Sequence, residues 1–135
     1  MKRQRGVTLM ELMTVVGVIG ILSSIAYPAY IEQARRGKRA SAKAMLAEVL
    51  QNQERFYSEN NTFTVAMADM GYGVGPYVSE NGTHTITLAA GPSGNIATSV
   101  SISATPVAAD AKCGVLTLTS TQARSASGTE PAICW

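Results

Sequence analysis

Glu11 is a carboxylate near the start of a strongly apolar run, RGVTLMELMTVVGVIGILSSIAYPAY, which occupies residues 5–30. An ionised carboxylate costs several kcal/mol in hydrocarbon unless it is paired, so an acid in such a run indicates a functional site. Two explanations stay open at this point. Glu11 lies at a membrane interface with its carboxylate in water, or a cut after Gly6 creates an amino group on Val7 that neutralises it from one helical turn away.

The two cysteines of the chain, Cys113 and Cys134, both lie near its C-terminal end. An even number of cysteines behind an export-like N-terminus favours a disulfide formed in an oxidising compartment. Closing a loop of about 20 residues stabilises a fold by roughly 3 kcal/mol in the chain-entropy description. The alternative is a pair of buried thiols in a cytosolic protein, and the N-terminal run argues against it.

The remaining residues give little support for an enzyme. The single histidine, His84, is expected at an ordinary exposed position of a strand, and no cluster of His, Cys or carboxylates has metal-ligand spacing. Gly71, Gly73 and Gly75 do not connect a strand to the start of a helix, so they predict a flexible loop and not a phosphate-binding loop. We therefore expect no catalytic residue, no metal and no cofactor.

The net charge of +2 hides an uneven distribution. Three basic residues lie within Met1–Arg5, and five more form a cluster between Arg35 and Lys43. From Ala44 onward there are three basic and seven acidic side chains, which does not indicate a strongly basic face for nucleic acid. The Arg35–Lys43 cluster is expected to meet lipid phosphates or acidic groups of adjacent subunits.

The element that positions Glu11 is a helix of membrane-spanning length. Leu12–Ile31 is a stretch of 20 residues without a charge, enough to cross a hydrocarbon core of about 30 Å. The basic residues before it are expected to stay on the cytoplasmic side. The segment Ala26–Pro28 offers no convincing signal-peptidase site, so the run is interpreted as a retained anchor.

The helical pattern continues beyond the apolar run as an amphipathic stripe. One helix is expected from about residue 8 to 58, with Gly17, Gly20 and Pro28 as the points where it bends or melts most easily. Good helix formers fill the second half of this helix. Its apolar face is predicted to contain Ala34, Ala42, Met45, Leu46, Val49, Gln53 and Phe56.

The rest of the chain predicts a small antiparallel sheet. A loop over residues 60–76 is followed by strand patterns in 77–79, 83–88, 99–104 and 114–119, with turn signals at Asn81-Gly82 and in 91–95. Residues 120–130 are expected to form an exposed polar loop. The prediction is an α+β fold in which three or four strands pack on the apolar stripe of the helical spine.

The stretch from Gly6 to Pro28 resembles the class III signal and N-terminal helix of type IV pilins. The resemblance rests on Gly6, on Glu11 five residues later, and on the unbroken apolar run that ends near Pro28. It implies that prepilin peptidase removes residues 1–6 and methylates the amine of Val7. The first mature residue of these proteins is usually Phe, and Val at this position affects methylation more than cleavage.

The same resemblance implies roles in assembly. Glu11 would neutralise the N-terminus of a neighbouring subunit, with Thr8 and Leu9 beside that contact, and residues 20–28 would lose helical hydrogen bonds in the filament. Residues 7–31 would form the membrane and filament-core helix, and residues 32–135 the periplasmic or extracellular head. The subunit would lie in the bacterial inner membrane and then, through the assembly platform, join other pilins in an extracellular filament.

The C-terminal segment, Cys113–Leu118 together with Cys134-Trp135, is similar to the disulfide loop of PilE- and ComP-type minor pilins. The predicted function is therefore a structural, minor subunit of a type IV pilus, serving motility, adhesion or DNA uptake. A DNA-binding pilin for natural transformation is a less favoured alternative, because only Lys112 and Arg124 flank the loop. A pseudopilin of type II secretion is a further alternative.

Overall fold

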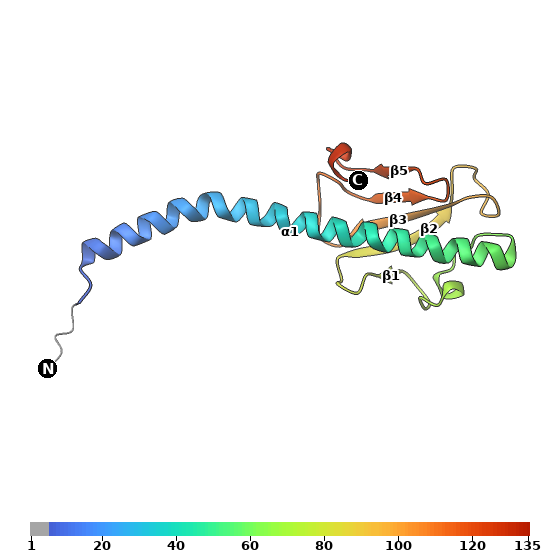
Figure 1. Cartoon of the computed structure of the whole chain (residues 1–135), viewed down its shortest axis with the longest axis horizontal. Coiled ribbons are helices and arrows are strands. Elements are labelled where there is room, and N and C mark those ends of the chain that lie inside the picture. Colours follow the sequence, from blue (N-terminus) through green and yellow to red (C-terminus); the bar gives the residue numbers. More distant parts are fainter. Residues whose placement is uncertain (1–5) are drawn as a thin grey trace. The chain divides into compact units, whose positions relative to one another are not determined.

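The structure is a computed structural model that describes residues 6–135, with an N-terminal unit up to Arg36 and a second unit over Gly37–Trp135. The basic stretch Met1–Arg5 of the predicted leader lies outside the described residues. One helix, α1 (Leu9–Asn60), contributes to both units and is 52 residues long (Figure 1). It remains helical at Gly17, Gly20 and Pro28, the three positions expected to be its weak points.

The N-terminal unit exposes nearly all of its apolar side chains. Leu9, Leu12, Val16 and Ile25 are among them, and no residue of the most apolar window is buried within the protein. By length and composition this part of α1 can cross a membrane. A helix that is apolar on all sides needs lipid or other helices around it, because water solvates it poorly.

The second unit combines the C-terminal part of α1 with a five-stranded sheet (Figure 1). The strands are β1 (Tyr77–Val78), β2 (His84–Ala90), β3 (Val100–Pro106), β4 (Leu116–Thr119) and β5 (Arg124–Ala126). Each strand pairs antiparallel with the next along the chain, so the sheet is a simple meander. The predicted α+β fold is confirmed.

The sheet has one strand more than the sequence predicts. β5 lies within residues 120–130, which are expected to form an exposed loop, and it pairs Arg124 with Leu118 and Ala126 with Leu116. It is three residues long, and Arg124 and Ser125 are exposed. So short and polar a segment carries no apolar alternation, which explains why the pattern of the sequence does not reveal it.

The core lies between α1 and the inner face of the sheet. The helix contributes Ala42, Leu46 and Val49, as its apolar stripe predicts, and also Leu50, which the predicted stripe does not contain, whereas Ala34 is exposed and outside the core. The sheet contributes alternate residues of its central strands: Ile86, Ile102, Ala104, Leu116 and Leu118. This is the period-two burial expected of a sheet with one covered face.

Gln53 ties the loop after α1 to the helix. Its buried side chain donates to the carbonyl oxygen of Thr64 at 2.7 Å and accepts from the Thr64 N–H at 3.1 Å. The loop continues through a short 3₁₀ helix, η1 (Met67–Met70), to β1. Both polar groups of the buried amide are therefore paired, which removes most of the penalty for burying them.

His84 is buried, contrary to the exposed position expected from the sequence. It begins β2 and faces the same side as Ile86, and it is only 5% exposed. Burial lowers the pKa of His84 because the charged imidazole loses solvation there, and the nearby Asp110 opposes this effect. The alternation of residues 83–88 already places His84 on the face of Ile86, so the expectation of exposure is wrong because it rests on the polarity of histidine and not on the strand pattern.

Candidate assembly helix and C-terminal site

The first turn of α1 is capped by the Thr8 side chain, a local feature that the sequence analysis does not predict. The Thr8 Oγ1 accepts the Glu11 N–H at 3.3 Å, and the Thr8 carbonyl accepts the Leu12 N–H at 3.1 Å. The spacing Thr-x-x-Glu is the sequence signature of such a start. Glu11 also places a negative charge at the positive end of the helix dipole, so it has a local stabilising role besides any role in assembly.

The predicted processing and assembly residues lie together at this helix start. Gly6 and Val7 precede the helix in irregular backbone and are exposed, as a protease site must be. Leu9 and the residues Leu12, Met13, Val16 and Gly17 line one apolar hollow on the helix next to Glu11. A carboxylate thus borders a large apolar surface, and such surfaces mark contacts with membranes or other proteins.

Arg39 and Asp110 form a buried ion pair in the head. Arg39 Nε donates to Asp110 Oδ2 at 2.6 Å and Arg39 Nη2 donates to Oδ1 at 2.8 Å, with the two side chains 5% and 12% exposed. Arg39 is therefore not part of a solvent- or lipid-facing basic cluster, which corrects the expectation for residues 35–43. The guanidinium lowers the pKa of the Asp110 carboxyl, chiefly through these hydrogen bonds.

The disulfide loop is built around the residues that follow Asp110. Cys113 and Cys134 form the predicted disulfide and are both buried. The segment after β5 runs beside Ala111–Cys113: the N–H groups of Gly128, Thr129 and Glu130 donate to the carbonyls of Cys113, Ala111 and Lys112 at 2.8–3.0 Å. A Cβ on Gly128 would lie 2.2 Å from the Lys112 carbonyl oxygen, so only glycine fits this close approach.

The two cations suggested for DNA contact each bind a residue of the C-terminal end. Lys112 Nζ lies 3.4 Å from Glu130 Oε1 in an exposed salt bridge. The Arg124 guanidinium lies over the Trp135 ring, 5.7 Å from its centroid, and the Trp135 indole N–H donates to the Ser125 carbonyl at 2.9 Å. Both cations are thus engaged by the segment Glu130–Trp135, and among the described residues no contact joins them directly.

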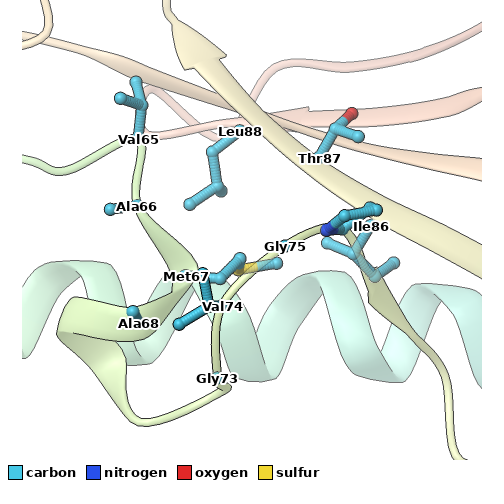
Figure 2. A pocket seen from close by; sticks show the side chains of 11 residues that line it. Val65, Ala66, Met67, Ala68, Gly73, Val74, Gly75, Ile86, Thr87 and Leu88 are labelled. Carbon is cyan, nitrogen blue, oxygen red and sulfur yellow. The ribbon is translucent and has the colours of Figure 1, made fainter.

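A second hollow lies in the head and has an apolar lining and a volume of about 360 Å³. Figure 2 shows it between the loop at Val65–Ala68, the Gly73–Gly75 turn and strand β2. Its lining contains no titratable side chain, so the hollow offers no acid, base or nucleophile. Within residues 6–135, no group of three or more His, Cys, Asp or Glu side chains could hold a metal ion.

Comparison with known proteins decides the family. A family model described as "Type IV minor pilin ComP, DNA uptake sequence receptor" matches residues 28–117, more than half of the chain. The chain belongs to this family of type IV minor pilins. A second model, "Prokaryotic N-terminal methylation motif", matches residues 1–27, which include the segment with Gly6, Val7 and Glu11.

The fold agrees with that family. A solved structure titled "High-Resolution Structure of a Type IV Pilin from Shewanella oneidensis" is 22% identical and superposes with a TM-score of 0.51. The match covers 74% of this chain and 96% of that one. No match was found among curated proteins. The chain is therefore a pilus subunit with the fold of a structural pilin, and its family implies association with other pilins.

Proposed function

We propose that the chain is a minor pilin that enters the filament through the exposed N-terminal part of α1. Prepilin peptidase would cut between Gly6 and Val7 on the cytoplasmic face and methylate the new amine. The subunit would wait in the inner membrane until the assembly platform adds it to an extracellular filament. The observation that carries this proposal is the capped, apolar helix start, with an accessible Gly6-Val7 bond before it and Glu11 at its edge.

The chemistry of Glu11 fits a contact between subunits. Cleavage would leave a positive charge on Val7 at the end of the helix where the dipole is also positive, which is unfavourable on an isolated subunit. A carboxylate from a neighbouring helix would neutralise that amine within an apolar bundle, where both charges cost least when paired. Thr8 and Leu9 lie between the two charged groups in the sequence and would flank this contact.

Intact mass spectrometry of filaments sheared from the producing cells tests the processing and the abundance together. We expect a species that starts at a methylated Val7 and contains the Cys113–Cys134 disulfide, present as a small fraction of the filament protein. A chain that keeps residues 1–6 in filaments would contradict the cleavage. If this species dominates the filament, the chain is the main shaft subunit and not a minor pilin.

A second candidate function is recognition of duplex DNA by the head. The description of the matched family as a DNA uptake sequence receptor favours it, although the charge balance of the head made it the weaker expectation from sequence. Arg124 is an exposed cation over Trp135, the only tryptophan of the chain, and Lys112 is a partly exposed cation paired with Glu130. Two phosphate contacts would give a shallow salt dependence, with a slope of about −2 in a plot of log affinity against log salt.

Replacing Glu130 with glutamine is expected to strengthen DNA binding about two- to fivefold. In the native chain a phosphate must displace the Glu130 carboxylate from Lys112, and an exposed pair of this kind is worth about 0–1 kcal/mol. The full-length protein in detergent can be titrated with duplex DNA while Trp135 fluorescence is followed. Glu59→Gln, which removes the same charge from an exposed position on α1, is the control. Equal gains in both variants would contradict a specific role for Lys112.

A further inference from the structure

We propose that Arg39 and Asp110 form a clamp that positions Lys112 for contact with a DNA phosphate. The spine helix would then determine the geometry of a DNA-contacting loop that is 71 residues away in sequence. The inference rests on the proposed DNA-binding function and deepens it, because it assigns positioning residues to a site whose contacting residue is Lys112.

The contacts of Asp110 make it the centre of the loop. Its two carboxylate oxygens accept the two hydrogen bonds from Arg39, and the backbone N–H groups of Lys112 and Cys113 further lower the pKa of this carboxyl. The Asp110 carbonyl accepts the Gly114 N–H at 2.7 Å. Asp110 therefore closes a tight turn with Lys112 in its middle and fixes the backbone from which the Lys112 side chain projects.

The two hydrogen bonds from the Arg39 guanidinium fix the position of this turn relative to α1. A guanidinium that binds both oxygens of a carboxylate restricts its position and orientation, which a lysine ammonium does not do. A buried ion pair often adds little net stability compared with apolar side chains, and in several proteins such a pair instead specifies one arrangement of the chain. The near-complete burial of Arg39 and Asp110 is consistent with that second role here.

The loop is also held on its other side, so Lys112 has little freedom. Backbone hydrogen bonds from Gly128 and Glu130 reach the carbonyls of Cys113 and Lys112, and the disulfide anchors Cys113 to Cys134. If the Arg39 side is loosened, the backbone at Lys112 can shift while the disulfide still holds the end of the loop. The expected consequence is loss of one phosphate contact without loss of the sheet.

The test uses the variant Arg39→Lys of the full-length protein. This substitution keeps the positive charge but removes the guanidinium that binds both carboxylate oxygens of Asp110. We expect a roughly three- to tenfold weaker affinity for duplex DNA. The slope of log affinity against log salt should fall in magnitude by about 1, the equivalent of one lost phosphate contact, as for Lys112→Gln. The double variant Arg39→Lys with Lys112→Gln is expected to bind no more weakly than Lys112→Gln alone. A purely structural effect would leave the salt slope unchanged, because it lowers the folded fraction and not the number of phosphates bound.

Hydrogen exchange of the same variant shows whether the head stays folded. The amides of Lys112 and Cys113 should exchange faster in Arg39→Lys, while those of Ile102 in β3 and Leu118 in β4 keep their protection. If the sheet amides lose protection too, Asp110→Asn serves as the second variant with the same expected salt slope. Wild-type protein that binds DNA and an Arg39→Lys variant with an unchanged slope would overturn the clamp alone. Wild-type protein that does not bind DNA would overturn both proposals.

Discussion

Replacing Glu11 with glutamine is expected to reduce incorporation of the chain into filaments at least tenfold, while the head folds normally. Within a bundle of apolar helices, an unpaired amine on Val7 of a neighbouring subunit would cost several kcal/mol. Glutamine has the same size as glutamate but cannot neutralise that amine. The measurement is the ratio of the chain in sheared filaments to the chain in membranes, determined by quantitative immunoblotting.

The choice of glutamine separates assembly from helix capping. The cap at Thr8 uses the backbone N–H of residue 11, so the helix start should survive a change of that side chain. Glu54→Gln, at an exposed position of α1 in the head, is the matched control and should enter filaments normally. Normal incorporation of Glu11→Gln would leave the interaction of its charge with the helix dipole as the explanation for Glu11.

The sequence predicts the helical spine and its environment well because these depend on composition and periodicity. The charge-free run Leu12–Ile31 and the stripe around Leu46 and Val49 each follow one simple rule. The disulfide can also be predicted from the sequence, since only two cysteines are present and only one pairing exists for them. The motif with Gly6 and Glu11 lies within one short segment, so its resemblance to the N-terminal segment of type IV pilins can be recognised without knowledge of the fold.

The contacts that organise the head depend on tertiary structure, and the sequence does not reveal them. Arg39 lies in a basic stretch, and although its spacing to Ala42 and Leu46 places it on the buried face of α1, nothing in the sequence identifies Asp110 as its partner. Strand β5 forms because its backbone completes the hydrogen bonds of β4, not because its side chains are apolar. His84 differs from these two cases, because the alternation within β2 places it on the face of Ile86 and only the polarity of histidine suggests exposure.

The candidate DNA site was only partly predictable. Lys112 and Arg124 could be singled out because they are two of the three basic residues after Ala44. Their partners Glu130 and Trp135 could not, because the salt bridge and the cation–π contact depend on how the C-terminal segment folds back on the loop. A charge balance counts these cations as free, whereas the structure shows both engaged by their own chain.

Replacing Asp110 with alanine is expected to lower the free energy of unfolding at pH 7 by about 3–5 kcal/mol. The substitution removes the carboxylate to which the buried Arg39 guanidinium donates two hydrogen bonds. Denaturant unfolding of the full-length protein in detergent, followed by Trp135 fluorescence, measures the change. Glu130→Ala is the matched control: it removes an exposed partner of Lys112 and should cost at most about 1 kcal/mol.

The pH dependence of this variant identifies the cause of the loss. The pKa of Asp110 is lower in the folded protein than its ordinary value of 3.8, so its stabilising effect is complete above that value and disappears as the pH falls through the folded pKa. The stabilities of wild type and Asp110→Ala should therefore converge below about pH 4. Burial lowers the pKa of His84, so both proteins should also lose stability as the pH falls below 6.5, where the unfolded histidine takes up its proton. A constant difference between the two proteins across the acid range would show that Asp110 stabilises the head by packing and not by its charge.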